Sequence, residues 1–313
     1  MKSNIKTNRP YITVIISAHD RKQYLKDAIN SVLNQTLDRS LYEIIVVKNF
    51  NDREIDKFIK QHNIRDIKFT RNQNLGAKFA EGLKRSRGDV VAFLEDDDLF
   101  ATNKLAKVYS LFKNNENLVY VHNNGYIIDE EGKIVRRNYA AKEPYFNNSS
   151  ISLRKDIVDK KFLKKGLVGV DALLYFFALR SGKGIKLLND KLTLYRSHAS
   201  LSGSIATKDL DYFVKDRRIL VEKVLKETQL YDSYFKRYYS ENRELMMSVK
   251  QRLNFYKSLF KIFNFEKEDI KTFLYLLYGG KARLAAAALI LPRRKLLELL
   301  LKAEPSNRTN KQK

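Results

Sequence analysis

A short apolar run followed at once by four acids constrains this chain more than any other stretch. Residues 90–94 are apolar, and Glu95, Asp96, Asp97 and Asp98 come directly after them. Five apolar residues in a row predict a strand that is buried on both faces, as strands of parallel sheets are. Ligands of open α/β sheets bind beyond the carboxyl ends of the strands, so the acids are expected at a ligand-binding edge.

Four neighbouring carboxylates repel one another, which indicates that a cation belongs among them. Oxygen ligands favour a hard divalent ion, and we expect Mg²⁺ or Mn²⁺. A solvated acidic turn is the simpler alternative. The buried strand before the acids, and the motifs described below, favour a binding site over that alternative.

Composition limits the classes of protein that are possible. With 313 residues, the chain is long for a single core, and it is expected to divide into residues 1–204 and 205–313. It has no Cys, which excludes disulfides, thiolate zinc sites and Cys nucleophiles. Residues 1–9 contain no apolar segment, so no signal peptide is expected there.

The net charge of +24 is spread over both parts of the chain. Residues 1–204 hold 36 basic and 23 acidic side chains, and residues 205–313 hold 24 and 13. Such a charge suits nucleic acid, an anionic membrane surface, phosphorylated substrates or simply a soluble Lys-rich surface. Because the basic residues are scattered and form no nucleic-acid-binding module, we do not expect nucleic acid as a partner.

The first hundred residues alternate between predicted strands and helices. Strands are expected at 11–17, 41–47, 67–70 and 90–94, with helical periodicity between them. This alternation predicts a doubly wound, mostly parallel sheet. The polar segments after three of these strands, at 18–21, 48–52 and 95–98, should meet at one edge.

The first strand is not followed by a glycine-rich phosphate loop. The absence of Gly-x-Gly-x-x-Gly argues against a dinucleotide-binding domain, and no P-loop motif occurs. The same absence counts against a nucleotidyltransferase. From residue 118 onward, short strands are expected at 119–122, 125–128, 133–135, 151–153, 186–188 and 192–195. A helix is expected from 169 to 179, and further helices at 210–226, 231–265 and 270–277.

In their order, the motifs of residues 10–204 resemble those of the family 2 glycosyltransferases. The resemblance rests on residues 12–20, the Ser-Val-Leu-Asn-Gln-Thr run at 31–36, the strand at 42–47, the segment 74–98 and the segment 192–198. It implies a GT-A-like α/β fold: a doubly wound mixed sheet flanked by helices, here with a C-terminal helical extension.

The resemblance also implies an activity, an inverting and metal-dependent sugar transfer. The donor would be a UDP- or GDP-linked sugar, and the acceptor a glycan, a polysaccharide or a lipid-linked glycan. The motif Glu95-Asp96-Asp97 matches the D-x-D pattern of the family. Asp97 is then the leading metal ligand, and Asp98 and His198 are further candidates.

The donor-binding residues are assigned by the same resemblance. They are expected to be Ala18, His19, Asp20, Asn49, Lys78, Glu95 and Asp96. Relatives commonly carry Asp-Asp-Gly-Ser after the strand that corresponds to 41–47, whereas this chain has Lys48-Asn49-Phe50-Asn51. That departure leaves the nucleobase open, and a catalytically inactive scaffold of the same fold is the alternative function.

Asp171 matches the acid that serves as the general base in the family. A base beside the acceptor hydroxyl is what an inverting displacement needs. Relatives have Glu immediately before this acid, and this chain has Val170. The alternative role of Asp171 is that of a first-turn acid of the helix it opens.

The C-terminal part contains a second informative stretch. Residues 284–291 are apolar, and Pro292 with three basic residues separates them from the run 296–301, which is leucine except for Glu298. Neither run is long enough to cross a bilayer, which takes about 20 residues. An amphipathic helix on an anionic membrane surface is expected, with a helical hairpin packed on protein as the alternative. The protein is therefore expected to be cytoplasmic or peripheral on the cytoplasmic face.

Overall fold

The computed structural model describes residues 9–19, 22–69, 74–139, 144–197 and 210–263. The strands are β1 (Ile12–Ala18), β2 (Tyr42–Lys48), β3 (Arg65–Lys68), β4 (Val90–Glu95), β5 (Leu99–Phe100), β6 (Leu118–Ile128), β7 (Ile134–Tyr139), β8 (Ile151–Arg154) and β9 (Gly184–Arg196). The helices are α1 (Lys22–Leu33), α2 (Arg53–Gln61), α3 (Leu75–Arg85), α4 (Lys104–Lys113), α5 (Lys160–Leu163), α6 (Val170–Ser181), α7 (Leu210–Tyr239) and α8 (Arg243–Phe263). The 3₁₀ turns are η1 (Arg39–Leu41), η2 (Asn148–Ser150) and η3 (Lys155–Ile157).

The described strands form one mixed sheet, which confirms the predicted fold class. Its order is β3-β2-β1-β4-β8-β6-β9-β5, with β7 paired to β6. The first four strands are parallel, and β8 then pairs antiparallel with both β4 and β6. Ala18 of β1 is in register with Lys48 of β2, and Ser17 with Glu95 of β4. The carboxyl ends of these three strands therefore lie at one edge.

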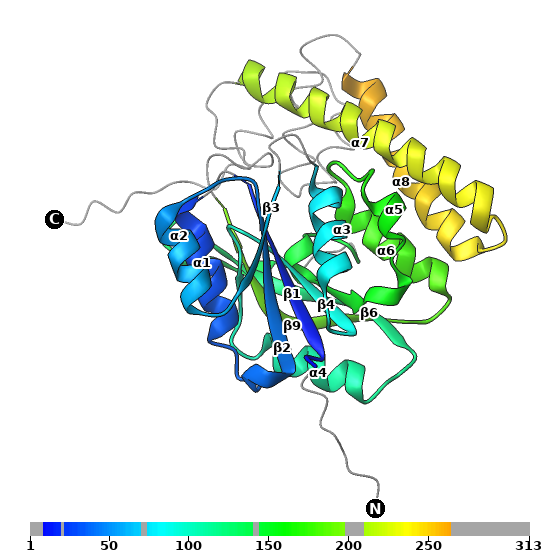
Figure 1. The fold of residues 1–313 in the computed structure, drawn as a ribbon. Helices are drawn as coiled ribbons and strands as arrows, with labels where there is room; N and C mark the ends of the chain where they lie inside the picture. The colour runs from blue at the N-terminus through cyan, green and yellow to red at the C-terminus, as the bar shows by residue number, and fades with distance from the viewer. Residues whose placement is uncertain (1–8, 20–21, 70–73, 140–143, 198–209, 264–313) are drawn as a thin grey trace, which may run out of the picture. The chain divides into compact units, whose positions relative to one another are not determined.

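Each face of the sheet carries its own hydrophobic core. Side chains alternate across a strand, so Ile15 of β1 joins one core while Val14 and Ile16 join the other. The first core packs against α3, α5 and α6, and the second against α1, α2 and α4 (Figure 1). Burial on both sides explains why β1 and β4 are apolar along nearly their whole length.

Two strands are longer than the sequence predicted. β6 is one strand where we expected strands at 119–122 and 125–128, because Asn123 and Asn124 also pair with β9, with shifts of register on either side of Asn124. The Asn123 side chain donates to Thr193 Oγ1 at 2.9 Å. β9 likewise joins the two strands expected at 186–188 and 192–195. Its pairing with β6 passes from Leu188 directly to Lys191, so residues 189–190 form a bulge rather than a turn.

The predicted break between the C-terminal helices was in the wrong place. α7 continues through residues 227–230, which contain no helix breaker, and ends at Tyr239. The chain turns at 240–242, and Asn242 Oδ1 accepts from the Leu245 amide at 3.0 Å as α8 begins. The helix expected at 270–277 and the amphipathic stretch at 284–301 lie outside the described residues.

The chain divides into two compact units. One comprises residues 1–204 with 226–252, and the other residues 205–225 with 253–313. Within the first unit, the segment 226–252 contributes Tyr231, Phe235 and Leu245 to the core on the α3, α5 and α6 face. No helix in the part of the chain described here is long and apolar enough to cross a membrane.

Gly76 offers a test of the contact between α3 and the loop after α5. A Cβ at this position would stand 2.0 Å from the Leu163 carbonyl oxygen and 2.7 Å from that of Gly166. Both atoms belong to the backbone, so Gly76→Ala should lower the free energy of unfolding by about 3 kcal/mol. Gly132→Ala is the control, because its Cβ would meet nothing within 4 Å and only its left-handed φ of 87° would be penalised, at about 1–2 kcal/mol. Equal losses in urea titrations would contradict the close contact.

Candidate functional site

The acidic motif forms a buried turn immediately after β4. The Asp98 amide donates to the Glu95 carbonyl at 3.2 Å, which closes the turn. Asp96, Asp97 and Asp98 are almost fully buried, with exposed fractions of 0%, 3% and 1%. Three buried carboxylates in sequence are costly unless they are hydrogen-bonded or paired with cations, so their partners define the site.

Asp98 points into the protein, where it holds two neighbouring segments together. Its Oδ2 accepts from Asn147 Nδ2 at 2.9 Å, and its Oδ1 accepts from the Arg196 backbone amide at 3.0 Å. Burial, followed by the negative charges of Asp97 and Glu95, raises the pKa of Asp98 well above its usual value. A bound divalent cation would oppose this effect by favouring the ionised form.

The loop before β8 closes over the acidic turn. Asn148 Nδ2 donates to Glu95 Oε1 at 2.9 Å, and the Glu95 amide donates to Ser149 Oγ at 3.0 Å. Asn147 takes a positive φ of 65°, and its Oδ1 accepts from the Ser149 amide at 2.7 Å. Asparagine tolerates this backbone conformation better than most residues, which explains its place at this corner.

Arg196, the last residue of β9, fixes the turn from the other side. Only 1% of its surface is exposed, and its guanidinium lies 4.5 Å from the centre of the Tyr24 ring. Its Nε donates to the Asp97 carbonyl at 2.9 Å, and Nη1 donates to the carbonyls of Asp129 and Glu130. The guanidinium thus binds the backbone of the turn, and its Nη2 lies 3.6 Å from Asp27 Oδ2.

A second buried cation, Lys104, supports the same loop. Its ammonium donates to the Ser149 carbonyl and, at 3.1 Å, to Thr193 Oγ1. Burial lowers the pKa of Lys104 well below its usual value, and the charge of Asp98 opposes that shift. Neither Arg196 nor Lys104 was among the predicted site residues, because nothing in the local sequence distinguishes them from solvated cations.

The candidate donor-binding residues converge on His19, just beyond β1. The His19 backbone amide donates to Asp96 Oδ2 at 2.8 Å, which joins the ends of β1 and β4. Asn49 Nδ2 and Lys78 Nζ lie 2.8 and 3.0 Å from His19 Nδ1, and Lys78 Nζ also lies 3.4 Å from the Ala18 carbonyl. Since an ammonium can only donate, Nδ1 accepts and the imidazole proton is on Nε2.

Lys48, which departs from the common family motif, is a structural residue here. Its ammonium is fully buried and lies 2.8 Å from Asp56 and 3.5 Å from Asp66. It also donates to the Phe50 carbonyl at 3.2 Å. Lys48 therefore pairs inside the domain, and Asn49 is the residue of this loop that meets His19.

Asp171 occupies the first turn of α6, as the sequence predicted. Its Oδ1 accepts from the Ala172 amide at 2.7 Å, and its carboxyl is half-buried. Burial and, next, the charge of Asp171 raise the pKa of Tyr120 well above its usual value. The Tyr120 hydroxyl donates to the Pro144 carbonyl at 2.8 Å. Tyr120 thus lies between Asp171, whose charge it senses, and the start of the segment that leads to the Asn147 loop.

The structure therefore joins Ala18, His19, Asn49, Lys78 and Asp96 in one network. Glu95 and Asp98 bond to the Asn147 loop, and the turn between them carries Asp97. Asp20 and His198 lie outside the described residues.

The chemistry of the acidic turn fits a divalent metal ion. Carboxylate oxygens are the ligands that Mg²⁺ and Mn²⁺ prefer. Burial and then the neighbouring negative charges raise the pKa of Asp98, and a cation would oppose both effects. Among the described residues, no three His, Cys, Asp or Glu side chains already converge as a complete ligand set.

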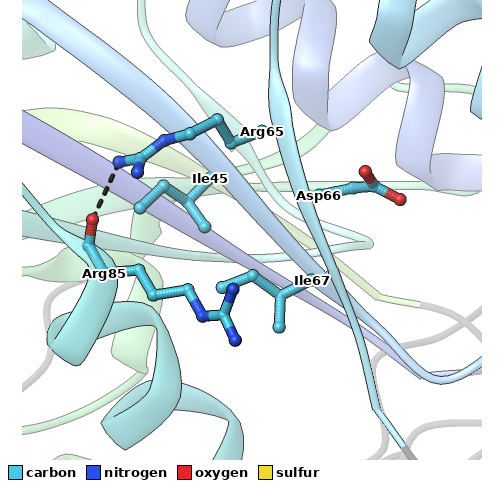
Figure 2. Close-up of a pocket in the computed structure, with 5 residues that line it drawn as sticks. All are labelled: Ile45, Arg65, Asp66, Ile67 and Arg85. Carbon is cyan, nitrogen blue, oxygen red and sulfur yellow. Dashed lines mark hydrogen bonds between the residues drawn. The ribbon is translucent and has the colours of Figure 1, made fainter.

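The pocket in Figure 2 lies elsewhere in the sheet. It has a volume of about 240 Å³ and is lined by Ile45, Arg65, Asp66, Ile67 and Arg85. Arg65 is 2.7 Å from Glu43, and Arg85 is 2.8 Å from Glu81. Because these arginines are paired with acids, the pocket offers little excess charge to an anionic ligand.

A family model describes more than half of the chain. The model of glycosyl transferase family 2 matches residues 13–179, from β1 to the end of α6. The match includes the acidic turn, the His19 network and Asp171.

Curated relatives are also glycosyltransferases. The chain is 29% identical to an uncharacterized glycosyltransferase of Methanocaldococcus jannaschii over 50% of this chain and 59% of that protein. It is 29% identical to another from Nostoc over 63% of this chain and 69% of that protein. It is 26% identical to the poly(ribitol-phosphate) β-N-acetylglucosaminyltransferase TarP of Staphylococcus aureus over 49% of this chain and 51% of TarP. The chain thus spans about half to two thirds of these relatives.

Solved structures share the fold at low sequence identity. Residues 1–349 of S. aureus TarS, in complex with UDP-GlcNAc, align with a TM-score of 0.50 and 13% identity, covering 93% of this chain and 91% of that one. The mannosyltransferase PcManGT of Pyrobaculum calidifontis, in complex with GDP-Man and Mn²⁺, aligns with a TM-score of 0.54 and 12% identity, covering 95% and 87%. These neighbours confirm the GT-A-like fold.

His122 gives the loop over the acidic turn a pH-dependent stability. Its Nε2 lies 2.7 Å from the Phe146 carbonyl, and burial lowers its pKa from 6.5 to about 4. The neutral form is favoured in the folded state, so its contribution is complete above pH 6.5 and is lost as pH falls toward 4. That loss amounts to about 2–3 kcal/mol. His122→Gln should flatten the dependence of unfolding free energy on pH across this window.

The matched control is His62→Gln, which removes an exposed imidazole. In urea titrations between pH 4 and 7, the unfolding free energy of this control should depend on pH as that of the wild type does. If plots of unfolding free energy against pH are parallel for wild type and His122→Gln, His122 is not held neutral in the folded protein.

Proposed function

The chain belongs to glycosyltransferase family 2, and we propose that it transfers a sugar, with inversion, from a UDP- or GDP-linked donor to a glycan, polysaccharide or lipid-linked acceptor. The observation that carries this proposal is the hydrogen-bonded network at the carboxyl edge of the sheet. There the His19 amide meets Asp96, and Asn49 and Lys78 meet the His19 ring. The same edge carries the acidic turn.

The His19 network supports a donor-binding role. Asn49 provides an amide at the place where relatives carry an acid, so hydrogen bonding to a nucleobase edge remains available. Lys78 is buried next to Asn49 and carries the positive charge that suits a diphosphate. Ala18, Asp20 and Glu95 complete the proposed donor site.

The metal would be held by Asp97, with Asp98 and His198 as the further proposed ligands. Mg²⁺ or Mn²⁺ would supply charge neutralisation for the departing nucleoside diphosphate. Arg196 and Lys104 keep the turn in place through its backbone and its covering loop. The complex of PcManGT with GDP-Man and Mn²⁺ supports this cofactor by analogy.

Asp171 is the proposed general base. As a first-turn residue of α6 with a half-buried carboxylate, it can accept the proton of an acceptor hydroxyl. The net charge of +24 and the basic, apolar C-terminal stretch support an anionic membrane surface as a further partner, with the protein cytoplasmic or on the cytoplasmic face.

Removing the Asp97 carboxylate should abolish metal-dependent nucleotide binding. We expect calorimetric titration of the wild type with UDP and GDP to show that Mn²⁺ strengthens binding of one of them. Asp97→Ala should lose that gain, because the metal would no longer link the turn to the diphosphate. Glu116→Ala, which removes an exposed acid, should bind like wild type. Folded wild-type protein that binds neither nucleotide would favour the inactive-scaffold function.

Replacing the proposed base should slow transfer without weakening donor binding. Asp171→Asn should lower kcat for nucleotide release from UDP-GlcNAc or GDP-mannose by about 10²- to 10⁴-fold. The affinity for the nucleotide, measured with Mn²⁺ by calorimetry, should stay at the wild-type value. An unchanged kcat would remove Asp171 from the catalytic role and leave it as a helix-terminal acid.

A further inference from the structure

We propose that Glu227 of α7 is a positioning residue for the base, setting the backbone that presents Asp171. This inference rests on the proposed function, because it takes Asp171 to be the proton acceptor. Glu227 lies 56 positions further along the chain and belongs to the same compact unit as Asp171.

The carboxylate of Glu227 accepts from three consecutive backbone amides. Its Oε1 lies 2.6 Å from the Leu167 nitrogen, and its Oε2 lies 3.1 Å from that of Val168 and 2.9 Å from that of Gly169. Gly169 is the N-cap residue of α6. The bonds therefore end two residues before Asp171.

Glu227 holds the approach to α6 and does not cap the helix itself. Gly169 has no side chain to accept from the first amides of α6, and no side-chain cap bond is formed. Within the first turn, the Ala172 amide donates to Asp171, whereas Glu227 accepts from the three amides that precede the helix. The negative charge of Glu227 also suits the positive end of the helix dipole.

The side chains of Leu167 and Val168 do not hold this part of the loop in place. Both are apolar, yet 51% and 37% of their surfaces are exposed. Their amides donate to Glu227 while their side chains face solvent. The bonds to Glu227 therefore restrain the backbone of the three residues that lead into α6.

Tyr231 holds Glu227 itself, and Arg252 lies beside the same stretch of backbone. The Tyr231 hydroxyl, from the next turn of α7, donates to Glu227 Oε1. Arg252 packs against Gly169, since its Nη2 would stand 2.8 Å from a Cβ built there. Glu227 and Tyr231 have exposed fractions of 4% and 0%, so this support is closed to solvent.

The expected consequence is a rate effect rather than a binding effect. A general base must lie within hydrogen-bond reach of the proton that it takes, and a displacement of about 1 Å can cost roughly 100-fold in rate. The donor-binding residues come from other elements, β1, β2, α3 and β4. Loss of the Glu227 contact should therefore leave nucleotide affinity intact.

The test compares Glu227→Gln with Glu241→Gln, which removes an exposed acid from the turn after α7. Glu227→Gln should lower kcat for nucleotide release from UDP-GlcNAc or GDP-mannose by roughly 10- to 100-fold. Its affinity for UDP or GDP with Mn²⁺ should match wild type. Hydrogen exchange of a peptide covering residues 163–172 should become faster, because the glutamine NH₂ faces amide donors. The Glu241→Gln control should match wild type in all three measurements.

Tyr231→Phe is the second variant, because it keeps the carboxylate and removes only its hydroxyl partner. It should change kcat and hydrogen exchange in the same direction by smaller amounts, even if Glu227→Gln folds poorly. Unchanged kcat or unchanged exchange in both variants would overturn the proposal, as would a parallel fall in nucleotide affinity. Asp171→Asn separates the two hypotheses. If Asp171→Asn keeps the wild-type kcat, the assignment of the base is wrong. If Asp171→Asn lowers kcat but folded Glu227→Gln keeps the wild-type kcat, only the role of Glu227 is rejected.

Discussion

Crowded negative charge at the end of β4 is the constraint on which the rest of this site depends. Asp96, Asp97 and Asp98 are buried within one turn, where burial, followed by the charges of Asp97 and Glu95, raises the pKa of Asp98. The protein answers with hydrogen-bond donors from several directions: the His19 amide, Asn147 and the Arg196 amide. Each donor fixes a different segment of the chain, so the acids organise the surrounding loops.

The parallel strands explain why these segments meet. In-register pairing of β1 with β2 and β4 brings their carboxyl ends to one edge, and the strands are held there by cores on both faces. The polar residues that follow the strands are positioned by the strand ends and by hydrogen bonds among themselves. The apolar strands and the polar residues at their ends thus have separate roles. The polar residues can differ between relatives while the sheet stays the same, and Lys48-Asn49 at the end of β2, where relatives commonly have an acidic motif, is one example.

Local patterns in the sequence were sufficient for the sheet and for the residues that directly follow its strands. Apolar runs before Glu95 and before His19 each predict a buried strand that is followed by polar residues. In the structure the two strand ends are joined by the hydrogen bond from the His19 amide to Asp96. Long-range partners left no comparable signal. Arg196 and Lys104 look like ordinary surface cations in sequence, and their burial depends on loops that pair over 40 to 100 positions. The ends of strands were predicted wrongly for a related reason: Asn123 and Asn124 continue β6 because they pair with β9, more than 60 positions away.

The loop between α5 and α6 contacts α3, which carries the proposed donor-binding residue Lys78, and leads into α6, which carries the proposed base Asp171. On one side, the Gly76 amide donates to the Gly166 carbonyl at 3.0 Å, and Asn74 Nδ2 donates to the Lys164 carbonyl at 3.0 Å. These bonds tie the loop to the start of α3, the helix that carries Lys78. On the other side, Glu227 binds the amides that lead to Asp171. This backbone segment thus contacts α3 at residues 164 and 166, and only beyond those contacts, at residues 167–169, does it bind Glu227 and lead into α6.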